Sequence, residues 1–266
     1  MPFYMSSGPA GEPISRTEAK LHMRVDANAE DSLTDLLITA ARQQVENVTR
    51  RQLITASYVM LRDSLPGRIV LLRPPLQSVS SVTYVDGAGA TQTAAATLYD
   101  VLIHREPGEI ILGYGDSWPT TRGHTNDVAI TWKAGYSSIF TAAVTGTCTV
   151  SGRTLVDGDV VRVWQSGGAL PTGLSANTDY YIISAAAQTC KLSLTSGGEA
   201  VAITAVGTGT HYMGDMPEPI RAAMRLLIGH LFEYREAIIT GTMVTVTPMA
   251  VKALLWPYRV FTEAET

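Results

Sequence analysis

The sequence predicts an α+β fold in which helices at both ends of the chain enclose an antiparallel β section that carries an inserted all-β domain. Three observations support this prediction. Apolar residues recur every three or four positions near both ends, which is the spacing of an amphipathic helix. Between the ends the period falls to two, and turn residues separate the segments, as in antiparallel strands. From about residue 137 to 214 the sequence is dominated by Thr, Ser, Gly, Ala and Val and shows no helical period.

Residues 1–14 are predicted to form a flexible arm. This segment has no basic region followed by an apolar core, so it does not have the pattern of a secretory signal. Glycines and prolines interrupt it throughout and oppose regular structure; they are Pro2, Gly8, Pro9, Gly11 and Pro13.

Two helices are predicted after the arm. Ser15 and Glu18 have the spacing of a capping box, so a short helix begins there and carries Leu21 and Val25 on one face. A longer helix follows from about Asp31. Its inward-facing positions are predicted to be Leu33, Leu36, Leu37, Ala40, Ala41, Gln44 (a polar interruption) and Val48. The positions left to face solvent or a neighbour are Asp35, Arg42, Gln43 and Glu46.

The β section is predicted to begin after Arg51. Short segments rich in β-branched or aromatic residues are separated by turn residues such as Pro66–Gly67 and Asp86–Gly87. The predicted strands are 54–61, 69–72, 79–85, 99–103, 109–112 and 128–132.

Residues 137–214 are predicted to form a separate all-β domain inserted into the parent fold. Loop sites tolerate such insertions when the two ends of the insert lie close together. Its predicted strands are 160–164, 180–184, 190–194 and 201–204. This divides the parent domain into an N-terminal part, 1–136, and a C-terminal part, 215–266. Cys148 and Cys190 are expected to be buried thiols, and the sequence leaves open whether they pair.

The C-terminal part is predicted to contain two helices. Pro217–Glu218–Pro219 has the chemistry of a helix start. The apolar stripe that follows is Ile220, Ala223, Met224, Leu227, Ile228 and Leu231. Residues 240–247 are predicted to be a segment of β-branched residues or a loop. Thr247 and Pro248 are expected to start a short helix that Pro257 ends. Its apolar positions are Val251, Leu254 and Leu255.

No pattern in the chain predicts catalysis, so no catalytic, cofactor-binding or metal-binding residue is assigned. No glycine-rich run ends in Gly-Lys-Ser/Thr, and the nucleophile-elbow-like segment 115–119 has proline in place of its second glycine. The five histidines show no paired ligand spacing. The net charge of −4 lacks the basic surplus of a dedicated nucleic-acid binder, and apolar runs are far shorter than a membrane span.

The ordered set of segments outside 137–214 resembles the head–tail connector (adaptor) proteins of long-tailed phages and phage-like particles. No single motif is diagnostic, and the combination in this order carries the resemblance. The segments that match are 18–26, 38–42, 48–51, 72–86, 114–119, 128–136, 217–224 and 253–259.

The resemblance implies a helical connector fold and a subunit of a dodecameric ring beneath the portal. In that family helices pack side by side around the ring, the C-terminal segment reaches toward the portal, and DNA passes through the lumen without specific binding. The lower face receives the next connector, a stopper or a tail-completion protein. The protein is then a virion component at the head–tail junction, assembled in the host cytoplasm.

Carried onto this sequence, the resemblance makes the aromatic and arginine residues of the tail candidates for the portal contact. They are Trp256, Tyr258, Arg259 and Phe261. The alternative, that Trp256 packs on its own subunit, has equal weight.

The insert resembles small β modules that decorate phage structural proteins, and it is expected to point outward toward capsid, a neighbouring copy or a host-surface glycan. The main alternative function is a carbohydrate- or host-binding virion protein that acts through the insert residues Trp164, Tyr180 and Tyr181. Exposure of these three side chains favours that alternative, and burial weakens it. A second alternative is a particle-associated hydrolase, which requires two carboxylates with perturbed pKa values in one cleft.

Overall fold

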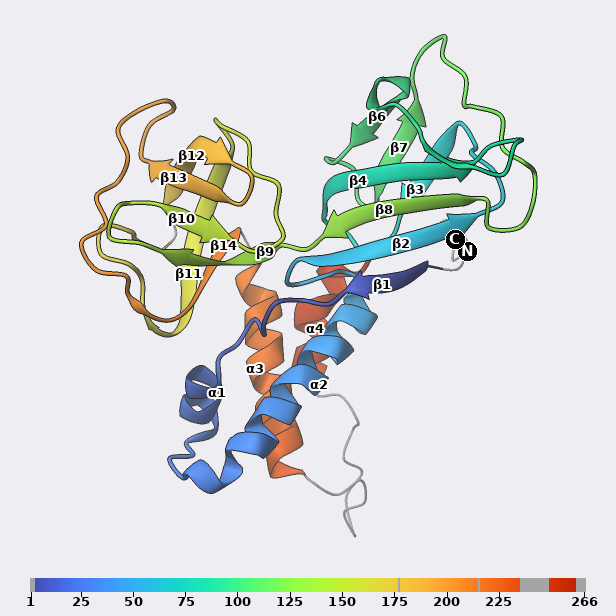
Figure 1. Ribbon diagram of the computed structural model, residues 1–266. Helices are drawn as coiled ribbons and strands as arrows, with labels where there is room; N and C mark the ends of the chain where they lie inside the picture. Colours follow the sequence, from blue (N-terminus) through green and yellow to red (C-terminus); the bar gives the residue numbers. More distant parts are fainter. Residues whose placement is uncertain (1–2, 177, 215, 235–248, 262–266) are drawn as a thin grey trace.

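The computed structural model describes residues 3–261 apart from 177, 215 and 235–248. Figure 1 shows a β-barrel and a twisted β-sheet side by side, with the helices gathered together on one side of both. The fold is mixed α+β, and strands make up more of the described chain than helices do. This agrees with the predicted α+β class.

The parent β section forms two antiparallel sheets within the described residues. The larger sheet has the order β1 (Phe3–Ser7), β2 (Ala56–Arg62), β8 (Val128–Ala134), β4 (Leu76–Val85) and β5 (Thr91–Thr93). The smaller sheet has the order β3 (Arg68–Leu71), β7 (Gly108–Leu112) and β6 (Tyr99–Leu102). Alternate residues of β2 and β8 are buried, and Trp132 stacks on Tyr58 with ring centroids 5.5 Å apart. The six predicted strands of this section are confirmed.

The segment predicted as a flexible arm, residues 1–14, contains a strand. Residues 3–7 form β1, which pairs with β2, and Ile14 is fully buried. The ring of Phe3 lies 5.8 Å from that of Tyr58 and 6.2 Å from that of Trp132. This aromatic packing and the β2 ladder stabilise β1, although prolines and glycines follow it directly.

Residues 137–214 contain a closed barrel of six described strands. Their order around the barrel is β10 (Cys148–Val150), β13 (Thr189–Ser193), β12 (Asp179–Ala186), β11 (Val160–Ala169), β14 (Thr208–Gly214) and β9 (Ser137–Ala142). Gly214 of β14 lies opposite Ser137 of β9, so the two ends of the segment are adjacent. Cys148 and Cys190 also lie opposite each other as buried free thiols, and burial raises their pKa values to about 12 and about 11.

The barrel strands were predicted only in part. β11, β12 and β13 are confirmed, whereas 201–204 is not a strand. Ile203 of that segment is buried in the barrel core and Val201 packs against the same core, so the apolar residues that suggested a strand contribute to the barrel interior. β14 was not predicted, because its glycines interrupt the alternation that marks a strand.

The α-helices of the described chain pack into a layer with its own core. They are α1 (Arg16–Met23), α2 (Asp31–Thr49), α3 (Glu218–Glu233) and α4 (Met249–Leu255), with short 3₁₀ turns at Asn28–Glu30, Ala96–Leu98 and Trp256–Tyr258. The predicted stripe of α3 is confirmed from Ile220 to Ile228, and Val251 and Leu255 of α4 are buried. Segment 240–247, Thr247 and Pro248 lie outside the described residues.

The predicted inward face of α2 is rotated from the observed one. Ile38 is 2% exposed and Leu36 is 65% exposed. Arg42 and Glu46, predicted for solvent or a neighbour, are buried; Arg42 pairs with Glu46 at 2.9 Å and with Glu12 at 2.7 Å. Because these charges neutralise one another, they can occupy buried positions that periodicity assigns to apolar side chains.

The same correction applies to α1. Leu21 is 80% exposed, while Ala19 is fully buried. Helix α1 therefore contacts the core through Ala19 and leaves Leu21 on its surface.

We expect Ile38→Ala to lower the free energy of unfolding by about 2–5 kcal/mol, because it leaves a cavity in the helical core. Leu36→Ala should change it by less than about 0.5 kcal/mol, since that side chain is exposed. Urea unfolding of both variants checks this, and a larger loss for Leu36→Ala would contradict the observed orientation of α2.

Candidate interaction surfaces

The cap of α1 connects this helix to the barrel. The hydroxyl of Ser15 accepts a hydrogen bond from the backbone N–H of Glu18 at 3.1 Å, as the capping-box spacing predicts. The reciprocal bond of a capping box, in which the Ser15 N–H donates to the Glu18 carboxylate, is not formed. That N–H donates to the Ser166 Oγ of β11 at 2.7 Å, and the Ser166 hydroxyl donates to the Glu18 carboxylate. The hydroxyl of Ser166, a barrel residue, therefore lies between the Ser15 N–H and the Glu18 carboxylate in the cap.

The carboxylate of Glu18 also binds α3. Arg221 approaches it at 3.2 Å and Arg225 at 3.4 Å. The Arg221 guanidinium lies 4.4 Å above the ring of Trp164, which stacks on Tyr212 with centroids 3.9 Å apart. We call Glu18, Ser166, Arg221, Trp164 and Tyr212 the barrel–helix clamp, because together they join β11 and β14 to α1 and α3.

The insert aromatics proposed as contact residues are mainly structural. Trp164 is buried in the clamp and its Nε1 donates to the Ser137 hydroxyl at 3.3 Å. Tyr180 is buried in the barrel core, where its hydroxyl accepts the Ser175 N–H at 2.8 Å. Tyr181 alone of the three is partly exposed. Trp164 and Tyr180 are therefore closed to an external ligand in this structure, which weakens the carbohydrate-binding alternative.

Three of the four candidate portal-contact residues gather on the surface. Trp256 is 60% exposed and Phe261 is 50% exposed, with their ring centroids 6.0 Å apart. The Arg259 guanidinium lies 5.1 Å from each ring centroid. We call Trp256, Arg259 and Phe261 the C-terminal aromatic cluster. Tyr258 is only partly exposed, and its carbonyl accepts a 2.6 Å bond from Nε of Arg51.

The helix layer exposes a leucine on each of α1, α2 and α3. Leu36 projects from α2, whereas Leu21 of α1 and Leu226 of α3 line a shallow groove together with Ala222. Exposed apolar side chains that cluster in this way mark surfaces for association with another protein.

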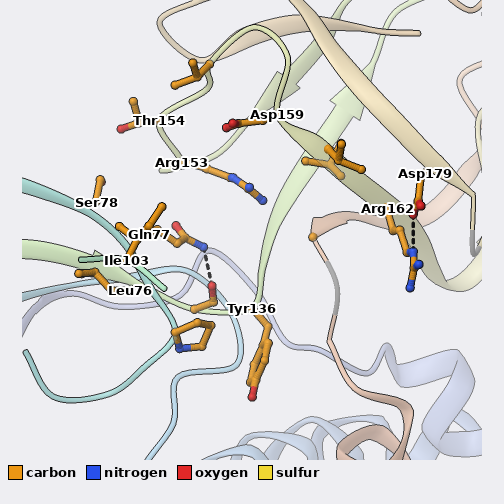
Figure 2. Close-up of a pocket in the computed structure, with 16 residues that line it drawn as sticks. Leu76, Gln77, Ser78, Ile103, Tyr136, Arg153, Thr154, Asp159, Arg162 and Asp179 are labelled. Carbon is orange, nitrogen blue, oxygen red and sulfur yellow. Dashed lines mark hydrogen bonds and ion pairs between the residues drawn. The ribbon is translucent and has the colours of Figure 1, made fainter. Parts of the chain in front are cut away.

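A cleft lies between the barrel and the larger sheet, with a volume of about 720 Å³. Figure 2 shows Gln77, Ile103 and their neighbours on one wall and Arg153, Asp159 and Arg162 on the other. The Gln77 amide donates to the Gly135 carbonyl at 2.7 Å, and Arg162 pairs with Asp179 at 2.6 Å.

Two carboxylates, Asp159 and Asp179, line the cleft. Asp179 is neutralised by Arg162 on the cleft wall. Outside the cleft, hydrogen bonding from Arg68, together with Arg105, holds the pKa of Glu109 below its usual range, so this carboxylate stays ionised. No cluster of three or more His, Cys, Asp or Glu side chains in the described part of the chain could hold a metal ion. None of the helices described is both long and apolar enough to cross a membrane.

No protein-family model matches the chain, and no curated protein matches its sequence. Solved structures do share its fold. A chain from the neck of an empty GTA particle, computed with C6 symmetry, matches with a TM-score of 0.57 at 17% identity, covering 98% of this chain and 97% of that one. A chain from the virion of a native gene transfer agent (GTA) particle matches with a TM-score of 0.57 at 16% identity, with the same coverage.

We expect Glu18→Ala to destabilise the protein by about 2 kcal/mol, because it strips charged hydrogen bonds from the largely buried Arg221. The matched control is Glu218→Ala, which removes an exposed partner of the same arginine and should cost less than about 1 kcal/mol. Urea unfolding followed by tryptophan fluorescence measures the stability of both variants. Equal losses of unfolding free energy would show that Glu18 contributes no more to stability than the exposed Glu218 does.

Proposed function

We propose that this chain is a structural subunit of the neck of a phage or phage-like particle, where copies form a ring that joins head to tail. The observation that carries the proposal is the end-to-end match of its fold, barrel included, with chains of GTA particles. An isolated shared domain would match over only part of the chain. The match over 98% of this chain argues for a common architecture and, on that basis, a common place in the particle.

The ring is proposed to close through the helix layer. Leu36 on α2 and the groove with Leu21 and Leu226 are different surfaces, so contact between them is heterologous, and heterologous contacts close into rings when the rotation permits. Burial of these leucines on assembly would remove the apolar surface that the single chain exposes. The twelve copies implied by the family resemblance are compatible with the C6 symmetry of the neck of the empty GTA particle, because a twelvefold ring retains sixfold symmetry.

The C-terminal aromatic cluster is proposed as the anchor on the portal. An exposed tryptophan beside an arginine has the composition of an interface hot spot. Within the ring, DNA passes through the lumen without specific binding, which suits a chain with a net charge of −4. The opposite face of the ring receives the next connector, a stopper or a tail-completion protein, and the assembled ring belongs to the virion after assembly in the host cytoplasm.

Residues 137–214 are proposed to be an inserted domain. The pairing of Gly214 with Ser137 brings its ends together, which is the geometry that an insertion requires. The domain points away from the lumen, where capsid or a neighbouring copy can reach it. Host-glycan binding is the second function proposed for this domain. Of its three candidate contact residues, the partly exposed Tyr181 is the one that a glycan could reach.

We expect Leu36→Glu to abolish the ring while leaving the fold intact, because it places a charge in an apolar interface and alters no buried contact of the subunit. Mass photometry measures the assembly and circular dichroism the fold. Thr93→Glu on the exposed strand β5 adds the same charge elsewhere and should leave the ring unchanged. Rings formed by Leu36→Glu would exclude this helix face from the interface.

We expect Trp256→Ala to weaken docking on the cognate portal by about thirtyfold or more without dispersing the ring, as loss of a hot-spot tryptophan does. Met249→Ala is the matched control, because Met249 is an exposed apolar residue of the adjacent helix α4. Titration of the portal protein followed by mass photometry gives the affinities. Equal affinities of the Trp256→Ala and Met249→Ala variants would remove the aromatic cluster from the contact.

A further inference from the structure

One wall of the cleft carries a cation, Arg153, that is unpaired among the described residues. Arg153 lies three residues after β10, and Figure 2 shows its guanidinium pointing into the cleft. Burial lowers the pKa of Arg153, although the nearby charge of Asp159 opposes this effect. Arg162 on the same wall is paired with Asp179, whereas Arg153 forms no hydrogen bond or ion pair with any residue that the structure describes. A partly desolvated, unpaired guanidinium favours an incoming carboxylate.

Aliphatic side chains surround this cation. Ile103 from the segment after β6, Val156 from the loop before β11 and Val160 at the start of β11 all line the cleft, and all three are exposed. The cleft therefore suits a carboxylate accompanied by apolar side chains. Duplex DNA is a poor fit, because DNA binding requires several free cations and Arg162, the other arginine of this wall, already pairs with Asp179.

The far end of the barrel presents the complementary chemistry. Val144 lies four residues before β10, and Leu194 follows β13 directly; both are exposed. Because β10 and β13 are antiparallel, the residues before one and after the other lie at the same end of the barrel. The hydrogen bond from the Val201 N–H to the Leu192 carbonyl, 2.7 Å long, returns the loop that bears the exposed Glu199 to this end. We call Val144, Leu194 and Glu199 the barrel tip.

We propose that the barrel tip of one copy docks into the cleft of a second copy, with Glu199 pairing with Arg153 and the aliphatic side chains packing around the pair. Val144 precedes β10 and Arg153 follows it, so tip and cleft lie at opposite ends of this strand. Figure 1 shows the loop after β13 on the side of the barrel away from the sheet. A chain therefore cannot fill its own cleft, and head-to-tail contacts of this kind suit a closed ring. The inference rests on the proposed function and adds a second, barrel-mediated interface to it.

Cross-linking with engineered cysteines tests the contact directly. The double variant Val156→Cys/Leu194→Cys places one thiol in the cleft and one on the tip, and the native Cys148 and Cys190 are buried and do not compete. A short bis-maleimide added to the assembled protein should give a ladder of covalent oligomers in denaturing electrophoresis. Either single variant should give dimers at most, because each copy then offers only one exposed thiol.

Charge reversal tests the ion pair. Arg153→Glu and Glu199→Arg should each weaken association about tenfold or more, and the double reversal should restore most of the loss. Arg162→Gln is the control on the same wall and should have a smaller effect, because that guanidinium already pairs with Asp179.

The outcomes separate this proposal from the proposed function. Rings seen by mass photometry without a cross-linked ladder would overturn tip-in-cleft docking and leave the ring subunit standing. Absence of both rings and ladder would overturn both proposals. A ladder combined with no effect of either charge reversal would overturn the Arg153–Glu199 pairing.

Discussion

The carboxylate of Glu18 holds together three parts of the chain that lie far apart in sequence. It belongs to α1, accepts the Ser166 hydroxyl of the barrel and pairs with Arg221 and Arg225 of α3. A largely buried carboxylate would destabilise the fold if it stood alone, and here two guanidinium groups and a hydroxyl compensate its charge. The position of the barrel relative to the helices depends on this compensation.

The clamp also decides which surfaces remain for other molecules. It uses Trp164 and Tyr212, the stacked aromatic pair of β11 and β14, inside the subunit. The surfaces left outward are the helix leucines, the C-terminal aromatic cluster, the cleft and the barrel tip. They lie on different parts of the molecule, which agrees with the proposed subunit that has several neighbours.

Local pattern was sufficient to predict much of the fold. Six strands of the parent sheets and α3 carry regular apolar spacing between turn residues, and the structure has them where the sequence predicts them. β1 was missed because its stability comes from β2, about fifty residues away in sequence. Of the four residues that the sequence offers for the portal contact, Trp256, Arg259 and Phe261 lie together, whereas the backbone of Tyr258 is engaged by Arg51. The burial of Trp164 follows from Arg221 and Tyr212, which no local pattern in β11 reveals.

The misplaced face of α2 has a physical reason that bears on function. Apolar periodicity identifies the buried side of a helix only when the helix has one partner. On α2, Ile38 faces the subunit core and Leu36 faces outward, so apolar residues occupy two sides of one helix. The apolar spacing of the sequence combines the residues of both sides, and the predicted inward face of α2 therefore falls between the two real apolar sides. A helix with apolar residues on two sides is expected where one side packs on its own subunit and the other on a neighbour. The proposed ring thus explains both the wrong prediction of the inward face of α2 and the exposure of Leu36.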